Sequence, residues 1–287
     1  MTSSTERARS KVLLALDGSP AAATACPLAR ALADQLGAVV EVFHVADRGG
    51  PDPDVWQRLH LNLQPGDEVQ VRSNVTEPAA ATLRATHEPA VEVVVLTTHG
   101  RIVQEGRALG RVAQNVVAHT RRPVLLVRPE AAADSEAAVA PLRRLLLPLD
   151  GTPTTATALR PATELACRLG AAIDLLYVVS PDQAAVREPG SIGVPRYIDQ
   201  PHHEWPAWAD RVIDHLSSCL GGRPPDVAVQ VFLAAGDIGA EIARFALEHQ
   251  SDAIVLVRRS QLEVGRARVL RAVLDRTPCP VLLVGAG

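Results

Sequence analysis

The stretch KVLLALDGSPAAATACPLARALADQLGAVVEVFHV, residues 11–45, returns in recognisable form as RLLLPLDGTPTTATALRPATELACRLGAAIDLLYV, residues 144–178. The two stretches align without a gap, so that Asp17 falls on Asp150. A match over a window this long indicates an internal duplication, and the repeated unit of about 140 residues has a usual size for a domain. The chain therefore reads as two copies of one domain.

The ends of the two copies also match, because RRPVLLVR at 121–128 answers PCPVLLVG at 278–285. The stretch PEAAADSEAAVAP between the copies is rich in alanine, acid and proline and has no apolar period, which is typical of a linker. We therefore predict a first domain at 8–129, a linker at 130–142 and a second domain at 143–287.

Each copy alternates short, β-branched apolar runs with Ala/Leu-rich helical patterns. Continuous apolar runs of this length indicate strands that are buried on both faces. The expected strands of the first copy are Val12–Leu16, Val39–Val45, Val69–Val71, Val91–Leu96 and Val124–Val127. Its expected helices are Ala21–Leu36, Glu77–Thr86 and Arg111–His119. The order predicts an α/β fold with an open parallel sheet and helices on both faces.

The second copy repeats this order. Its expected strands are Leu145–Leu149, Ile173–Val179, Val227–Phe232, Ile254–Val257 and Val281–Val284. The helix-end residues agree with the strands: Ser19 is a candidate N-cap before Pro20. Gly37 and Gly170 stand where helices end in a left-handed residue, and Asp237 is placed to cap the helix after the third strand.

Composition limits the classes of function. Apolar residues make up 47% and charged residues 21% of the chain, and the net charge is −3. This balance predicts neither a nucleic-acid partner nor a membrane-surface partner held by bulk charge. No apolar run is long enough to span a bilayer, and the polar start does not resemble a secretory signal. Four isolated cysteines are expected to be small buried thiols in a reducing cytoplasm.

A ligand of an open parallel sheet binds beyond the carboxyl ends of its strands, where the strand order reverses. Asp17 follows the first strand, and Thr97–Gly100 follow the fourth. The loop after Gly100 leads to a helix start at Gly110, where unpaired N–H groups attract anions. The residues alone leave two interpretations open. Asp17 and the glycines form a nucleotide site, or they only turn the chain and cap the next helix.

Other motifs that carry chemistry are missing. The sequence has no Walker A loop, no GxGxxG after a first strand and no GxSxG elbow. The run His202-His203-Glu204 has no suitably spaced third ligand, so no metal site is expected. With no nucleophile and base pair in view, we do not expect an enzyme.

The chain resembles the tandem form of the universal stress proteins over nearly its whole length. The resemblance is carried by LLALDGSP at 13–20, VFHVAD at 42–47, and THG at 98–100 followed by nine residues and GRVAQNVVAHTRRPVLLVR at 110–128. ATP-binding members of that family carry G-x-x-G, nine residues and G-[ST] after strand four. Gly100 and Gly110 match its second and third glycines, whereas Thr97 replaces the first glycine and Arg111 the Ser/Thr.

The resemblance implies two tandem doubly wound domains, each with strand order 3-2-1-4-5. It assigns adenosine contacts to Asp17 and Val45 and phosphate contacts to the loop and helix start. The candidate ATP-binding residues are Asp17, Val45, Thr97, His99, Gly100, Gly110, Arg111 and Val112. Mg²⁺ is expected as the counter-ion of the nucleotide. Arg111 either replaces the lost hydroxyl with a charge-assisted contact or fills the pocket.

The second copy departs further from the family signature. Asp150 and Val178 match, but Ser260 and Ala267 stand opposite Gly100 and Gly110 in a shorter loop. Several arginines around this loop could hold an anion or form a solvated helix face: Arg258, Arg259, Arg266, Arg268 and Arg271.

Two functions compete at this point. One is a cytoplasmic stress-response protein whose first domain binds ATP or another adenine nucleotide as a sensor. The other is an interaction module that keeps the fold, has lost phosphate binding and acts through protein partners. The family also pairs fifth strands, which implies an intramolecular pseudo-dimer and allows a homodimer.

Overall fold

The structure is a computed structural model. It describes residues 9–45, 66–72, 77–99, 108–129, 141–150, 152–179, 214, 227–258, 264–277 and 279–285. The chain divides into two compact units, Met1–Pro141 and Leu142–Gly287. Most of the predicted linker, and Gly100 with the loop after it, lie outside the described residues.

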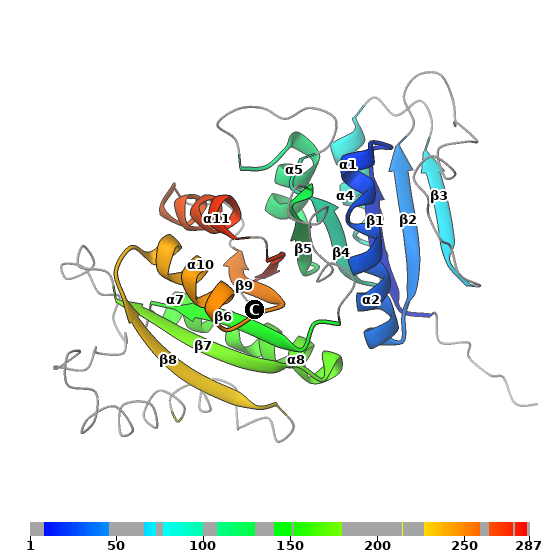
Figure 1. The fold of residues 1–287 in the computed structure, drawn as a ribbon. Coiled ribbons are helices and arrows are strands. Elements are labelled where there is room, and N and C mark those ends of the chain that lie inside the picture. Colours follow the sequence, from blue (N-terminus) through cyan, green and yellow to red (C-terminus); the bar gives the residue numbers. More distant parts are fainter. Residues whose placement is uncertain are drawn as a thin grey trace, which may run out of the picture. The chain divides into compact units, whose positions relative to one another are not determined.

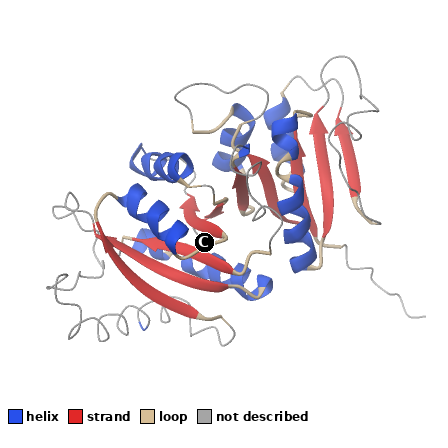
Figure 2. Cartoon of the chain, in the orientation of Figure 1, coloured by secondary structure: helices blue, strands red, loops and turns tan. Residues whose placement is uncertain are grey.

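The first unit is built on a parallel five-stranded sheet (Figures 1 and 2). Its strands are β1 (Lys11–Leu16), β2 (Val39–Val45), β3 (Glu68–Arg72), β4 (Val91–Thr97) and β5 (Val124–Val127). They lie in the order β3-β2-β1-β4-β5. The predicted order is confirmed, and the central position of β1 leaves Val12–Leu14 almost fully buried.

The second unit repeats the same sheet. Its strands are β6 (Arg144–Leu149), β7 (Ala172–Val179), β8 (Val229–Ala235), β9 (Ala253–Arg258) and β10 (Val281–Gly285). All pairings are parallel, in the order β8-β7-β6-β9-β10. The duplication in sequence is therefore a duplication of fold, since each strand of the second sheet has the place of its counterpart in the first.

Helices cover both faces of each sheet (Figure 1). The first unit has α1 (Pro20–Ala23), α2 (Cys26–Leu36), α4 (Pro78–Ala85) and α5 (Arg111–His119). The second has α7 (Pro153–Ala156), α8 (Leu159–Leu169), α10 (Ile238–Glu248) and α11 (Val264–Arg276). Within each unit one helix packs on the first two strands, α2 or α8, while α4 pairs with α5 and α10 with α11. This is the doubly wound arrangement that the alternating pattern predicts.

Two predicted elements differ from the structure. The single helix expected over 21–36 is broken between α1 and α2, where Pro27 has no N–H to donate to the preceding turn. The expected strand Val227–Phe232 begins later and runs on to Ala235, since the apolar run continues until Gly236, whose φ is 148°.

The predicted helix ends are confirmed. The Ser19 hydroxyl accepts a hydrogen bond from Ala22 N at 3.1 Å, which caps α1. Gly37 and Gly170 adopt left-handed conformations with φ of 61° and 63°. The Asp237 carboxylate accepts from Ala240 N at 2.9 Å at the start of α10. This hydrogen bond, with the neighbouring Arg276, lowers the pKa of Asp237.

An ion cluster that sequence reasoning missed lies at the amino end of the first sheet. Lys11, the only lysine of the chain, contacts Glu41 at 3.2 Å, Glu68 at 2.7 Å and Glu88 at 2.8 Å. The Glu41 side chain is 1% exposed, and within the described part of the chain it pairs with Lys11. Burial raises the pKa of Glu41, and the Lys11 charge opposes that rise. Burial also acts to lower the pKa of Lys11, but the three carboxylates together raise it.

We predict that an amine-reactive N-hydroxysuccinimide ester leaves Lys11 unmodified in the native protein and modifies it after unfolding in guanidinium chloride. The reagent needs an accessible neutral amine, whereas the Lys11 side chain is 10% exposed and held protonated by its carboxylate partners. Mass spectrometry of proteolytic fragments measures the modification. A peptide containing residues 8–15 gives the reference rate, and equal rates for native protein and peptide would contradict the buried cluster.

Two further expectations have mixed outcomes. Among the described residues, no helix is both long and apolar enough to cross a membrane. Three cysteines lie in the described part and are free, but only Cys26 and Cys279 are partly buried, while Cys167 is exposed. The expectation of uniformly buried thiols is therefore wrong for Cys167. Burial raises the pKa of Cys26 to about 12, so this thiol is not activated as a nucleophile.

Candidate nucleotide site of the first unit

The carboxyl ends of three neighbouring strands bring the predicted residues to one edge of the first sheet. Asp17 directly follows β1, Val45 ends β2 and Thr97 ends β4. Since β1 lies between β2 and β4, the chain leaves β1 for β2 on one side and later returns to β4 on the other. The strand order therefore reverses beside Asp17 and Thr97, at the place where open α/β sheets bind ligands.

The Asp17 carboxylate organises the turn after β1. Its Oδ1 accepts hydrogen bonds from Ser19 N at 3.0 Å and from Ser19 Oγ at 2.6 Å. Ser19, not Asp17, caps the helix, so the aspartate holds the capping residue in place. Gly18 between them has φ of 77°, a left-handed conformation that glycine adopts without strain. This geometry fixes the position of the Asp17 carboxylate at the switch point.

The equivalent aspartate of the second unit makes more bonds within its own turn. Asp150 Oδ1 accepts from Thr152 N at 2.9 Å, from Thr152 Oγ1 at 2.6 Å and from Thr155 Oγ1 at 2.7 Å. Thr155 stands where the first unit has Ala22. One additional hydroxyl therefore bonds to the carboxylate oxygen in the second unit.

The start of α5 is the second half of the candidate site. Gly110 is the N-cap residue, and no side chain caps the helix among the described residues. Gly110 N donates to Thr98 O at 2.8 Å, and Gly110 O accepts from Gln114 N at 2.8 Å. The N–H groups of Arg111, Val112 and Ala113 therefore begin the helix without intrahelical acceptors, which gives the helix start a partial positive charge.

Glycine at position 110 is not required by backbone conformation. Its φ is −67° and its ψ is 164°, values that any residue can adopt. A Cβ added there would lie 3.6 Å from Thr98 O and 3.8 Å from His99 Cα, which are ordinary contacts. The absence of a side chain leaves the approach to the helix start open, and a substitution at Gly110 can test binding without unfolding the unit.

The remaining candidate residues have different environments. The Arg111 side chain is 76% exposed and lies 3.9 Å from Glu77, which is 66% exposed, so this ion pair is weak. Arg111 therefore does not fill a pocket in the described structure. His99 Nδ1 lies 3.3 Å from Thr98 Oγ1, with Thr98 almost fully buried. Gly100 lies outside the described residues.

The carboxyl edge of the second sheet is built differently. Arg258 ends β9 at the position where the first unit has Thr98, and it is 6% exposed. The interpretation of its arginines as a solvated face is therefore wrong for Arg258, although Arg268 and Arg271 are exposed. Burial lowers the pKa of Arg258. A large buried guanidinium at this edge distinguishes the second unit from the first.

No metal centre is present in the part of the chain that the structure describes, since it has no group of three or more His, Cys, Asp or Glu side chains that could hold an ion. The His202-His203-Glu204 run lies outside that part. The Lys11 cluster escaped sequence reasoning. Two signals could have found it: a single lysine in the chain, and an acid, Glu41 or Asp174, inside an apolar strand of each copy.

Comparison with known proteins identifies the family of this chain. The universal stress protein family model matches residues 8–128 and 141–285. These two matches span most of the chain, and the chain belongs to that family. No match is found among curated protein sequences.

Solved structures share the tandem fold at low sequence identity. A universal stress protein from Archaeoglobus fulgidus is 16% identical, covers 96% of this chain and 98% of its own, and superposes with a TM-score of 0.62. A functionally unknown protein from Pseudomonas aeruginosa PAO1 is 12% identical, with 97% and 93% covered and a TM-score of 0.57. At these identities the likeness establishes the fold alone.

Proposed function

We propose that the first unit binds ATP or another adenine nucleotide, and that the chain acts as a cytoplasmic stress-response sensor rather than an enzyme. One observation carries the proposal. The fold gathers Asp17, Val45, Thr97 and the start of α5, which none of the described side chains caps, around the carboxyl edge where the strand order reverses. A carboxylate that can accept from ribose hydroxyls beside a helix start that attracts phosphate suits a nucleotide.

The position of Arg111 supports a role for this residue in contacting the phosphate groups. It is the first residue of α5, its guanidinium is exposed, and in the described part of the chain it pairs with the exposed Glu77 at 3.9 Å. A weakly held arginine can turn to a phosphate group without losing a strong contact. Mg²⁺ would enter as the counter-ion of the nucleotide phosphates.

A second candidate is an interaction module that acts through protein partners without a nucleotide. The departures from the family signature at Thr97 and Arg111 favour it, since Thr97 adds a side chain beside the expected path of the phosphates and Arg111 stands in place of the phosphate-binding hydroxyl. Mass spectrometry of small molecules released from the freshly purified protein, followed by calorimetric titration with ATP and Mg²⁺, separates the two. No released nucleotide and no heat at millimolar ATP would favour the interaction module.

We expect Arg111→Ala to weaken nucleotide binding by about 1.5–3 kcal/mol, the value of a hydrogen bond to a charged group. Calorimetry with ATP measures the loss. Arg121→Ala is the matched control, because Arg121 is also exposed but follows the other end of α5. Unchanged binding in Arg111→Ala would mean that the arginine does not contact the phosphates, and tighter binding in Arg111→Ser would mean that it obstructs the site.

Gly110→Val is expected to abolish nucleotide binding while the unit stays folded. The backbone at this position accepts a side chain, but valine would stand at the approach to the uncapped N–H groups of α5. Circular dichroism checks the fold and calorimetry the binding. Wild-type affinity in a folded Gly110→Val protein would place the ligand elsewhere.

A further inference from the structure

The amino ends of the two sheets carry the same ion pair in different surroundings. The duplication relates Lys11 to Arg144 and Glu41 to Asp174. In each unit a cation at the start of the first strand pairs with a buried acid on the second, Glu41 in one and Asp174 in the other. This end lies opposite the carboxyl edge of the candidate nucleotide site.

In the first unit the cation is saturated. Lys11 contacts Glu68 at the start of β3 and Glu88 before β4, in addition to Glu41. Three carboxylates surround one ammonium group, whose side chain is 10% exposed. No donor of this lysine is left for a ligand without displacing a glutamate.

In the second unit, among the described residues, Arg144 has no counterpart of the contacts that Lys11 makes with Glu68 and Glu88. Glu68 lies opposite Glu41 in the first sheet, and Gln230 lies opposite Asp174 in the second, so a neutral amide replaces that glutamate. Val93 pairs with Val12 and Ala253 with the equivalent Leu145. Ala253 is therefore the counterpart of Val93. Glu248 precedes Ala253 by five residues, as Glu88 precedes Val93, so Glu248 is the counterpart of Glu88.

Glu248 does not replace Glu88 as a partner of the cation. Its carboxylate accepts from Arg244 Nη1 at 2.8 and 3.0 Å, on the same helix. Arg144 retains Asp174, at 3.4 Å. A guanidinium has five N–H donors, and among the described residues this long contact uses one of them.

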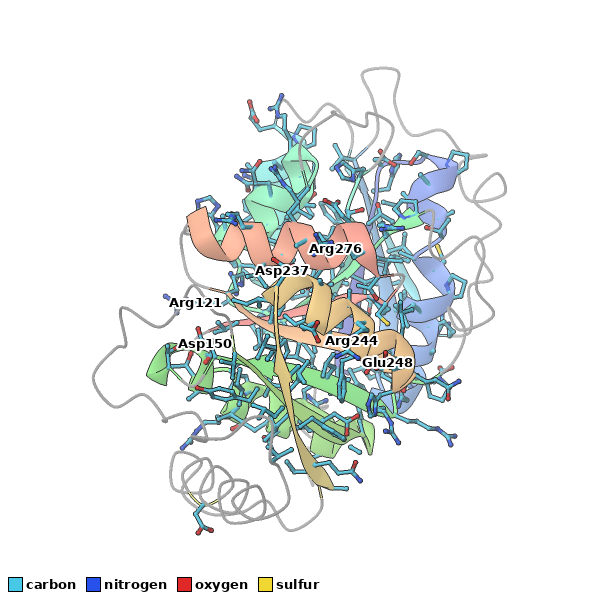
Figure 3. The ribbon with its side chains drawn as sticks, turned by 60° about the vertical axis from the view of Figure 1, so that its left-hand side comes forward. Arg121, Asp150, Asp237, Arg244, Glu248 and Arg276 are labelled. Carbon is cyan, nitrogen blue, oxygen red and sulfur yellow. The ribbon has the colours of Figure 1, made fainter. Side chains whose placement is uncertain are left out.

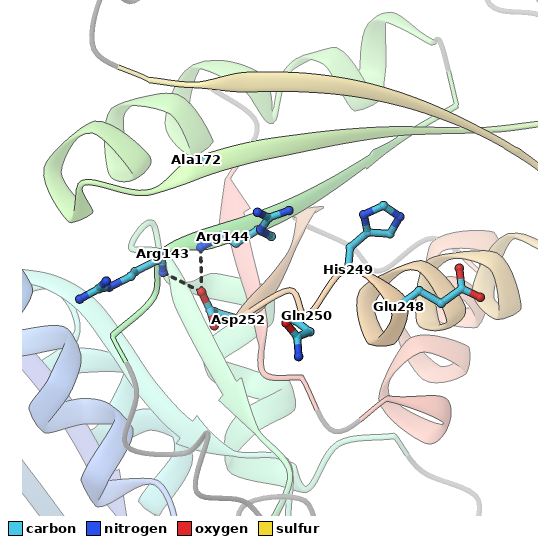
Figure 4. A pocket seen from close by; sticks show the side chains of 7 residues that line it. All are labelled: Arg143, Arg144, Ala172, Glu248, His249, Gln250 and Asp252. Carbon is cyan, nitrogen blue, oxygen red and sulfur yellow. Dashed lines mark hydrogen bonds between the residues drawn. The ribbon is translucent and has the colours of Figure 1, made fainter.

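A pocket of about 470 Å³ lies beside Arg144 (Figure 4). In this view the Arg144 side chain extends toward His249, whereas Arg143 extends in the opposite direction. The His249 ring is held by a stack on Phe245, with centroids 3.8 Å apart. Gln250 adds an amide to the lining. The volume is in the range of small-molecule sites.

The acids of the pocket already have partners. Asp252 accepts from the backbone N–H groups of Arg143 and Arg144, both at 2.8 Å, and Glu248 is engaged by Arg244. Figure 3 labels two ion pairs of this region. Arg276 of α11 donates to Asp237 at the start of α10, and Arg244 pairs with Glu248 within α10. Of the two lining arginines, Arg144 is the one whose side chain extends toward His249, and among the described residues it uses one of its donors, on Asp174.

We propose that this pocket binds a small oxyanion, the carboxylate or phosphate group of a metabolite, through Arg144. The ligand would supply the negative charge that Glu68 and Glu88 supply to Lys11 in the first unit. The His249 ring and the Gln250 amide line the same volume and can donate to the remaining oxygens. The site is separate from the candidate nucleotide site, and its test does not depend on nucleotide binding.

Titration with sodium phosphate and with sodium malonate tests the proposal, with sodium chloride at the same ionic strength as reference. Nitrogen-15 NMR of the Arg144 side chain and of Gln250 reports the location. We expect a saturable shift that chloride does not give. Tighter binding of phosphate identifies a phosphorylated ligand, and tighter binding of malonate a carboxylate. A response no different from that of chloride overturns the proposal.

Two variants make the test specific. Arg144→Gln should weaken anion binding by at least about tenfold, and the exposed Arg160→Gln of α8 should not. Gln230→Glu restores the counterpart of Glu68, one of the two extra carboxylates of the first unit, and should also weaken binding. Its exposed position avoids a folding defect. The control for that change is Gln114→Glu on the exposed face of α5. Unchanged affinity in folded Gln230→Glu would overturn the role of Arg144.

Discussion

Lys11→Met is expected to destabilise the first unit by about 3–5 kcal/mol at neutral pH, the usual loss when one partner of a buried ion pair is removed. Glu68 and Glu88 are 49% and 37% exposed and can turn to water. Glu41 is 1% exposed and would remain as a buried, unpaired carboxylate. Denaturant unfolding followed by circular dichroism measures the loss, and hydrogen exchange of β1 assigns it to the first unit.

The loss should shrink in acid. Burial already raises the pKa of Glu41, and removing Lys11 removes the charge that opposes that rise. The folded state of the variant therefore binds a proton more readily than the unfolded state. Stability then falls as pH rises from the ordinary carboxylate range through the raised folded pKa, and it recovers as pH is lowered. Comparing the variant with wild type at several pH values between 5 and 8 measures this slope.

A second substitution isolates Glu41 as the cause. Lys11→Met/Glu41→Gln should regain most of the stability at neutral pH and lose the added pH dependence, because no charge remains buried. Glu41→Gln alone is the reference for the cycle. A loss below about 1 kcal/mol in Lys11→Met, far under the usual range, would contradict the cluster. So would the absence of rescue.

The sequence could predict what local patterns and topology decide. Apolar runs located every strand of both sheets, and the family order placed Asp17, Val45 and Thr97 at one edge. Pro27 also indicated a helix break, because proline has no N–H to donate, but the Ala/Leu pattern on both sides favoured one continuous helix. These features depend on residues close together in the chain.

The ion clusters depend on cross-strand register, which no local pattern specifies. Lys11 meets Glu68 and Glu88 only because β3 and the chain before β4 end beside β1. The sequence likewise does not reveal that Glu248 pairs with Arg244 and leaves Arg144 with Asp174. Long-range pairing therefore surrounds Lys11 with carboxylates in the first unit and leaves Arg144 beside a pocket in the second, although the two units share one duplicated sequence.

Gly239→Val is expected to destabilise the second unit by about 3 kcal/mol, at the upper end of the range for overpacking. Gly239 lies in the first turn of α10, against Ala272 of α11. A Cβ at Gly239 would come 2.4 Å from Ala272 Cβ and 3.6 Å from its Cα. The two helices must then separate, and the buried Ile242 and Val273 would lose packing. Denaturant unfolding with hydrogen exchange of α10 measures the loss.

Removing the opposing methyl group tests whether this contact is the cause. Gly239→Ala alone should destabilise, whereas Gly239→Ala/Ala272→Gly should regain most of the loss, because the nearest remaining Ala272 atom is 3.6 Å away. Ala272→Gly alone should cost about 1 kcal/mol from helix propensity. Gly37→Ala is the matched glycine control: a Cβ there meets nothing within 4 Å, so its cost comes from φ of 61° alone. If the double variant is as unstable as the sum of the two single variants, the helices do not touch at this point.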